Sequence, residues 1–159
     1  MDILFIVGTF EALFLTILVM AMKNRTNADL FLGLIFLIDG LSIGLAYLQY
    51  FNINNGYPYP WALNLGFTFL FLHGPALWFY IRSLSLNGFT FKPVYLLHFL
   101  PFIFFFAIQY QTFAVLDFNE KIKIVSSESF KTQNFYKIAV LCIGLSTITY
   151  YSWGLYQIR

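Results

Sequence analysis

Five long stretches of almost unbroken apolar residues dominate this sequence, and each is 17 to 22 residues long. A helix needs about 20 mostly apolar residues to cross a bilayer, whereas a barrel strand needs only about ten residues that alternate in polarity. The lengths therefore predict an all-α fold, a polytopic integral membrane helical bundle with about five transmembrane helices. The expected spans are residues 3–22, 30–51, 61–81, 94–110 and 135–156.

The composition leaves too little polar surface for a water-soluble domain. Of the 159 residues, 60% are hydrophobic and 10% are charged, while a soluble domain usually carries about a quarter charged residues. This excludes an ordinary cytosolic enzyme, a disordered tail and a nucleic-acid-binding domain. The single cysteine, Cys142, excludes a disulfide framework and a cysteine-based zinc site. We expect a single transmembrane domain over residues 1–159, with one long polar outer loop at residues 111–134.

The basic residues predict the orientation, because cytoplasmic loops are enriched in Lys and Arg. The short loops after the first and third spans carry Lys23, Arg25, Arg82 and Lys92, and Arg159 ends the chain. The loop after the second span has no charge, and the loop after the fourth balances three lysines against three acids. We therefore expect an N-out/C-in, multi-pass protein of the cell inner (cytoplasmic) membrane. The first span lacks the basic flank of a cleaved signal peptide, so we expect it to be retained.

Three ionisable residues fall near the middle of the first three spans: Glu11, Asp39 and His73. Buried ionisable groups are costly in a membrane, so these are the natural candidates for a functional site. If the three helices are neighbours, the side chains form one polar cluster, either a proton-linked site or a polar ligand pocket. The structural alternative is a set of neutral carboxyls that hold the bundle together by hydrogen bonds. With no second imidazole at that depth, we expect no metal and no cofactor.

Small residues and prolines mark candidate packing and kink positions. Gly40 and Gly44 form a small-xxx-small pair, which favours close helix packing within the bundle and could also serve dimerisation. Gly74 and Pro75 interrupt the third span and predict a kink, because proline cannot donate a backbone hydrogen bond. Pro101 has the same character near the start of the fourth span.

His98 lies one turn into the fourth span, where a structural cap or an interhelical hydrogen bond is the simplest role. No nucleophile elbow, H-E-x-x-H motif, phosphate loop or dinucleotide fingerprint occurs in the sequence. We therefore expect no catalytic residues and no enzymatic activity.

Two proline-containing signatures carry a resemblance to a known family. The run 72–84 contains Gly74–Pro75 and ends in Arg82-Ser83-Leu84, and His98-Phe99-Leu100-Pro101 opens the fourth span. The region from Phe14 to Phe106 resembles the membrane-embedded N-terminal half of bacterial AraC-type transcriptional regulators, in which transmembrane helices precede a helix-turn-helix domain. The resemblance implies a role in signal sensing and transcription regulation. The DNA-binding domain is absent from this chain, so we expect a fragment or an independent membrane part.

The first functional hypothesis is therefore a sensory or anchoring membrane domain whose ligand is unknown. The alternatives are a small proton-linked transporter and a membrane assembly partner. The expected partners are the lipid bilayer and, through Gly40 and Gly44, a second copy in a homo-oligomer. This segment carries too few basic residues to bind nucleic acid.

Overall fold

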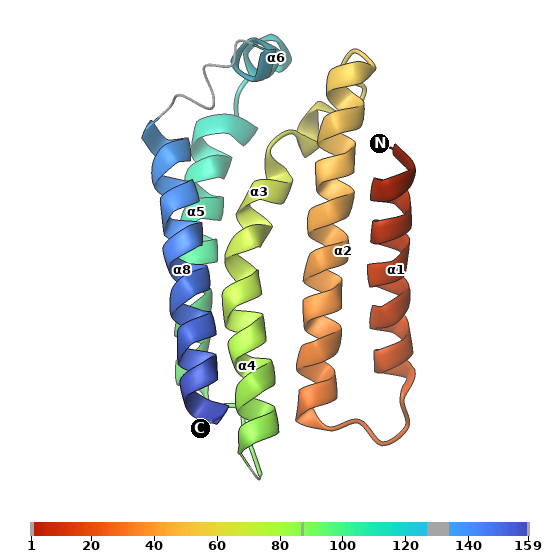
Figure 1. Cartoon of the computed structure of the whole chain (residues 1–159). Coiled ribbons are helices and arrows are strands. Elements are labelled where there is room, and N and C mark those ends of the chain that lie inside the picture. Colours follow the sequence, from red (N-terminus) through yellow and green to blue (C-terminus); the bar gives the residue numbers. More distant parts are fainter. Residues whose placement is uncertain (1, 87, 127–133, 159) are drawn as a thin grey trace.

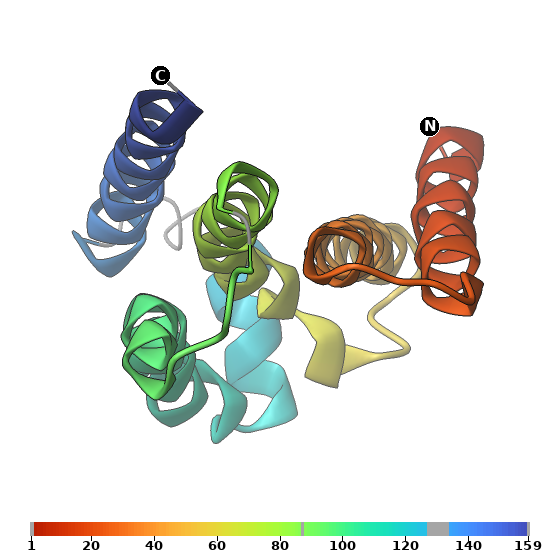
Figure 2. The ribbon, with the colours of Figure 1, turned by 90° about the horizontal axis from the view of Figure 1, so that it is seen from below.

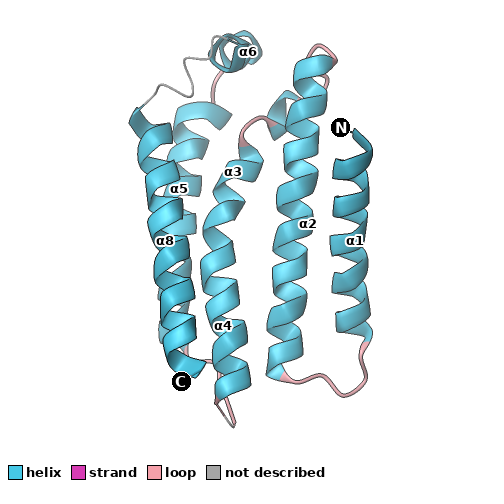
Figure 3. Ribbon diagram, in the orientation of Figure 1, coloured by secondary structure: helices cyan, strands magenta, loops and turns pink. Residues whose placement is uncertain are grey.

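The computed structural model describes residues 2–86, 88–126 and 134–158, and these residues form helices and connecting turns without a strand (Figure 3). Three long helices are α1 (Asp2–Ala21), α2 (Asn27–Asn54) and α8 (Asn134–Ile158). A fourth long segment, Pro60–Ser85, combines several helical pieces. These four segments are long and apolar enough to cross a membrane. The first, second, third and fifth stretches expected from the sequence correspond to them.

The start of α2 is fixed by a local capping box. The Thr26 hydroxyl accepts a hydrogen bond from the Asp29 backbone N–H, and the Asp29 carboxylate accepts one from the Thr26 backbone N–H. Each side chain thereby satisfies a backbone donor that the first helical turn leaves without a partner. On the other side of this turn, the Arg25 guanidinium donates to the Met20 carbonyl near the end of α1 at 2.6 Å.

The third apolar segment changes helix type along its length. It begins with a 3₁₀ turn (Pro60–Ala62) and continues through α3 (Leu65–Phe69), a second 3₁₀ turn (Leu70–Leu72) and α4 (His73–Ser85). Pro75 has no N–H to offer the carbonyl of Phe71 four residues earlier, which is one reason why the α-helical ladder changes just before it. The interruption expected at Gly74–Pro75 thus lies one turn earlier, at residues 70–72.

The fourth apolar segment is not a uniform α-helix. Residues Pro93–Phe99 form a 3₁₀ helix, Leu100–Gln109 form α5, and Tyr110–Ala114 form a π-helical turn. Pro101 lies in the first turn of α5, where proline is well tolerated because its missing N–H would have no intrahelical partner. The apolar helical stretch Pro93–Gln109 is shorter than the four long segments.

The polar stretch expected to be a loop contains a further helix. This helix, α6 (Phe118–Ser126), lies across one end of the bundle, above α5 and beside the upper end of α2 in the view of Figure 1. Its apolar and charged residues alternate with helical spacing, so it has one apolar and one polar side. Sequence analysis missed it because a helix of 9 residues is too short to stand out among polar residues.

Glycines lie at the contacts of α2 with α1 and of α4 with α8. A Cβ on Gly40 would lie 2.9 Å from Leu13 of α1, and one on Gly44 would lie 3.3 Å from Thr9. In the other half of the molecule, a Cβ on Gly74 of α4 would lie 2.6 Å from Tyr150 of α8. Seen along the helices, α4 lies between α2 and α8, and α1 lies on the far side of α2 (Figure 2).

Burial is concentrated in the segment at the centre. In the most apolar window of Pro60–Ser85, 56% of the residues are buried, against 6% in α1 and 11% in α8. Trp78 and Phe79 of α4 are almost fully buried and centre a cluster of aromatic rings. The outward sides of α1, α5 and α8 instead expose large apolar side chains.

Candidate functional site

Asp39 of α2 and His73 of α4 meet across the interface between these helices. The His73 Nε2 atom lies 2.7 Å from Asp39 Oδ1, within hydrogen-bonding distance. The Asp39 side chain is 37% exposed and the His73 side chain 30% exposed, so the pair is partly shielded from solvent rather than enclosed. Asp39 lies twelve residues into α2, which places it about 18 Å along the helix from its start. The structure thus joins two of the three ionisable residues singled out by the sequence.

The second nitrogen of His73 restricts how protons can be arranged in this Asp39–His73 pair. Its Nδ1 atom is buried and has no hydrogen-bond partner among the described residues. A buried N–H without an acceptor is more costly than a lone pair without a donor. For an imidazole with a single ring proton, the geometry therefore favours the tautomer that carries this proton on Nε2, where it points to Asp39 Oδ1. Adding a second proton to the ring would create a buried donor that needs a new acceptor.

Glu11 does not join the pair. Its side chain is exposed on α1 and makes no hydrogen bond or ion pair with any described residue. Its neighbour Ala12 is the residue that faces α2, close to Gly40. Because successive residues are separated by about 100° around a helix, Glu11 is turned away from this contact. Counting residues along the helices does not fix the rotational position of Glu11 about α1, so the three-residue cluster expected from the sequence is reduced here to Asp39 and His73.

The Gly40 and Gly44 face is occupied within the chain. Both glycines lie against α1, through Leu13 and Thr9 respectively. A second copy could reach this face only by displacing α1, so the packing interpretation fits these glycines and the dimerisation interpretation does not. Gly74 has the equivalent role between α4 and α8, and Pro75 next to it is buried.

An amide network, formed by Gln49, Asn64, Thr68 and Gln109, links α2, α3 and α5. The Asn64 backbone N–H donates to Gln49 Oε1 at 3.2 Å, and Gln49 Nε2 donates to Asn64 Oδ1 at 3.3 Å. Gln109 Nε2 donates to the Asn64 carbonyl at 2.6 Å, and Gln109 Oε1 accepts from the Thr68 hydroxyl. Asn64 has a φ of 61°, a left-handed conformation that asparagine tolerates better than most residues. Sequence analysis did not single out this network, although two glutamines within apolar stretches were the available signal.

His98 lies in an aromatic cluster at the opposite end of the bundle. Its Nδ1 is 2.8 Å from the Tyr150 hydroxyl oxygen of α8, which makes an interhelical hydrogen bond. The imidazole ring lies 4.5 Å from the Trp78 ring and 5.9 Å from the Trp153 ring, centre to centre. The Arg82 guanidinium lies 5.0 Å from the Trp78 ring, so the cluster also contains a cation–π contact.

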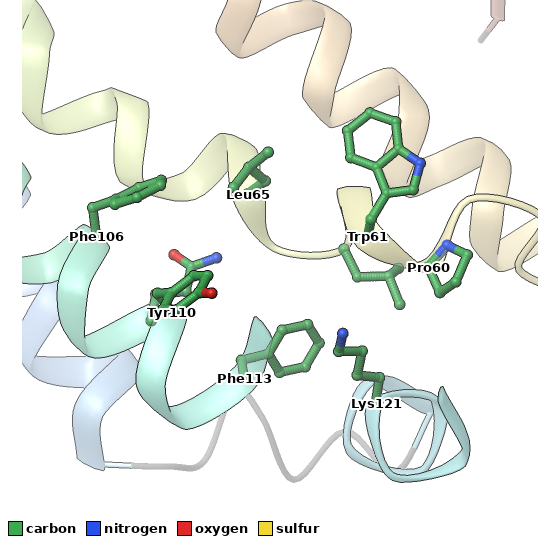
Figure 4. A pocket seen from close by; sticks show the side chains of 9 residues that line it. Pro60, Trp61, Leu65, Phe106, Tyr110, Phe113 and Lys121 are labelled. Carbon is green, nitrogen blue, oxygen red and sulfur yellow. The ribbon is translucent and has the colours of Figure 1, made fainter. Parts of the chain in front are cut away.

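A small pocket lies where α6 covers the end of the bundle. Trp61, Phe106 and Phe113 are among its apolar walls, and Lys121 extends from α6 toward them (Figure 4). The cavity holds about 100 Å³, well below the several hundred Å³ of a usual small-molecule site. Its size fits a packing gap under α6 better than a binding site.

The described residues contain no group of three His, Cys, Asp or Glu side chains able to hold a metal ion. The Asp39–His73 pair is therefore the best candidate for a functional site, because it combines two titratable groups with an apolar setting and a change of helix type beside it. No protein-family model, curated protein or solved structure matches this chain.

Proposed function

We propose that this chain is a membrane-embedded sensory and anchoring domain, similar to the membrane part of AraC-type regulators, with five crossings. The crossing added to the four long segments, fourth in chain order, is the segment Pro93–Gln109. Its seven 3₁₀ residues rise about 2.0 Å each and its ten α-helical residues rise about 1.5 Å each. The sum, about 29 Å, equals the hydrocarbon thickness of a typical bilayer. The longer rise of the 3₁₀ helix makes up for the small number of residues.

The N-out/C-in orientation is supported by the charges at the two ends of the bundle. The α1–α2 turn, which carries Lys23 and Arg25, lies at the end of the bundle where the C-terminus lies (Figure 1). The end of α4 lies there too, with Arg82 in its last turn and Lys92 in the connection that follows. At the opposite end, α6 carries two lysines and one glutamate and follows Asp117. An excess of basic residues favours the cytoplasmic side, so the C-terminal end is assigned to the cell interior.

The observation that carries the sensory role is the Asp39–His73 hydrogen bond. Histidine is the side chain best suited to change its charge between pH 5 and pH 8, and here any change in proton number alters the contact between α2 and α4. Protonation of His73 would place an N–H at the buried Nδ1, which has no acceptor among the described residues, so the ring would reorient. A small displacement of α4 would pass to α8, because Gly74 contacts Tyr150 and Ile81 contacts Gly154 along the same interface. The signal is thus delivered to the C-terminal, cytoplasmic end.

Spin-label distances test this proposal. In a Cys142→Ser background, cysteines replace Lys23 in the α1–α2 turn and Ser85 at the end of α4, and the protein is placed in lipid nanodiscs. We expect the distribution of label distances to change between pH 8 and pH 5. Asp39→Asn combined with His73→Gln should abolish the change.

Glu11→Gln is the matched control, since it removes a carboxyl at similar depth that lies outside the pair. It should retain the full response. A distribution that does not move with pH in the unsubstituted protein, or one whose response depends on Glu11, contradicts the sensory role.

A second candidate, a small proton-linked transporter, is favoured by a groove beside the pair. The groove holds about 410 Å³ between α2 and α3, and Ser42, one turn after Asp39, lines it. The Ser42 hydroxyl is buried and has no partner among the described residues. Uptake of substrate into proteoliposomes driven by a pH gradient, lost in Asp39→Asn and retained in Glu11→Gln, would select transport over sensing.

A further inference from the structure

We infer that the end of the bundle at which α4 finishes binds the phosphate of an anionic phospholipid headgroup, through Arg82 and Lys92. Both residues line an open groove of about 220 Å³ between the end of α4 and the start of the Pro93–Phe99 helix. The inference rests on the membrane placement proposed above. It adds a specific ligand class to a region that the Asp39–His73 pair does not reach.

The position of the Arg82 guanidinium is fixed before any ligand arrives. It lies 5.0 Å from the Trp78 ring and 5.4 Å from the Tyr95 ring, and Tyr95 is also part of the groove wall. With the Gln157 amide oxygen turned toward its donors, Arg82 Nη1 donates to it at 3.2 Å. The remaining N–H groups of the guanidinium form the planar fork that binds phosphate in two-point contacts. Holding this fork in place lowers the entropic cost of binding.

No carboxylate within the described ranges neutralises the positive charge of the groove. Neither Arg82 nor Lys92 makes an ion pair with a carboxylate among the described residues, and the buried Arg82 Nε has no acceptor. Asp29, the described carboxylate at this end, is engaged by the backbone N–H and hydroxyl of Thr26. Two cations on one groove that no described carboxylate neutralises favour an anionic ligand, and the Thr90 side of the groove offers further polar surface.

The surroundings of the groove identify the anion as a lipid rather than a free phosphate. From Lys92 toward the middle of the bundle, the next helical stretch exposes large apolar side chains: Val94 is 58% exposed, Leu96 55%, Leu97 58% and Leu100 53%. An acyl chain that lies along these residues places its headgroup at the level of Arg82 and Lys92. Basic pockets between transmembrane helices on the cytoplasmic side suit anionic lipid headgroups in this way. A soluble phosphate would gain nothing from the apolar rim.

Native mass spectrometry of the detergent-solubilised full chain tests the site with three probes: phosphatidylglycerol, phosphatidylcholine and soluble glycerol phosphate. We expect phosphatidylglycerol to bind most tightly. Lys92→Gln should weaken its binding about fivefold, and Arg82→Gln with Lys92→Gln about 30-fold, as expected for about 1 kcal/mol per basic residue. Lys23→Gln, which removes a basic residue at the same end outside the groove, should leave binding unchanged.

Arg82→Lys guards against a folding defect, since it keeps the positive charge but loses the planar fork; it should bind phosphatidylglycerol more weakly than the unsubstituted protein and more tightly than Arg82→Gln. Equal affinity for phosphatidylcholine, an equal loss in Lys23→Gln, or glycerol phosphate binding as tight as the lipid would each overturn the inference. This measurement does not depend on the Asp39–His73 pair. If label distances do not change with pH but phosphatidylglycerol is still preferred, the sensory role alone is rejected. If label distances change with pH but phosphatidylglycerol is not preferred, the lipid site alone is rejected.

Discussion

The two polar centres of this molecule, the amide network and the Asp39–His73 pair, differ in chemistry and therefore in what they can do. In the amide network, uncharged side chains link three helices through four hydrogen bonds, and Thr68 and Asn64 are almost fully buried. The Asp39–His73 pair makes one contact between two titratable groups that are each about a third exposed. A network of neutral groups keeps its hydrogen bonds at any pH, whereas a titratable pair changes with its protons. The uncharged hydrogen bonds and the titratable pair thus lie at different heights of the bundle.

The largest expected effect comes from removing the centre of the amide network. Gln109→Leu leaves the Asn64 carbonyl and the Thr68 hydroxyl without their partner. Because each buried group without a partner costs about 1–3 kcal/mol, we expect the free energy of unfolding to fall by at least about 2 kcal/mol. Thermal unfolding in detergent measures it at pH 5 and pH 8, and the loss should be equal at both. A pH-dependent loss would contradict the distinction between the two centres.

A smaller effect is expected from Asn64→Ala. Alanine loses the hydrogen bond to Gln49 and must adopt a left-handed backbone conformation, which costs about 1–2 kcal/mol in a residue with a Cβ. Asn64→Gly loses the same side chain without that strain. Thermal unfolding should therefore rank the two variants with alanine less stable than glycine. Equal stability of both would show that the left-handed conformation of Asn64 does not contribute to the effect.

The smallest effect is expected at the Asp39–His73 pair. A double-mutant cycle with Asp39→Asn and His73→Gln should give a coupling energy of about 0.6 to 1.7 kcal/mol, the range of hydrogen bonds between membrane helices. The same cycle with Glu11→Gln and His73→Gln should give a coupling close to zero. Strong coupling between Glu11 and His73 would mean that the predicted three-residue cluster forms after all.

The sequence was most informative where apolarity alone decides the outcome. Long apolar stretches located the four long helical segments to within a few residues, and Pro75 correctly signalled an interruption in the third. The length of an apolar stretch and the effect of a proline depend only on residues close together in the chain, so both can be predicted from a single sequence. In the fourth stretch Pro101 likewise lies beside a change of helix type, but apolarity does not indicate that the residues before it, Pro93–Phe99, form a 3₁₀ helix.

For the candidate site, the position of each residue along its helix could be predicted from the sequence, but the side of the helix that faces a neighbour could not. Counting residues placed Glu11, Asp39 and His73 near mid-height, yet which side of α1 faces α2 is decided by the fit of Ala12 and Leu13 against Gly40. Gln109 is separated from Thr68 by 41 residues in the chain, so only the fold brings them together. Hydrogen bonds between residues so far apart in the chain can be identified only from the three-dimensional structure.

The burial of the central segment also bears on the order in which the chain would enter a membrane. Pro60–Ser85 is the least apolar of the four long segments and the most buried, and α2 and α8 both pack against its α4 part. The α1–α2 hairpin is the more apolar and precedes it in the chain. We therefore expect the hairpin to insert first during synthesis and to serve as the surface on which the central segment, a weak insertion signal by itself, is retained.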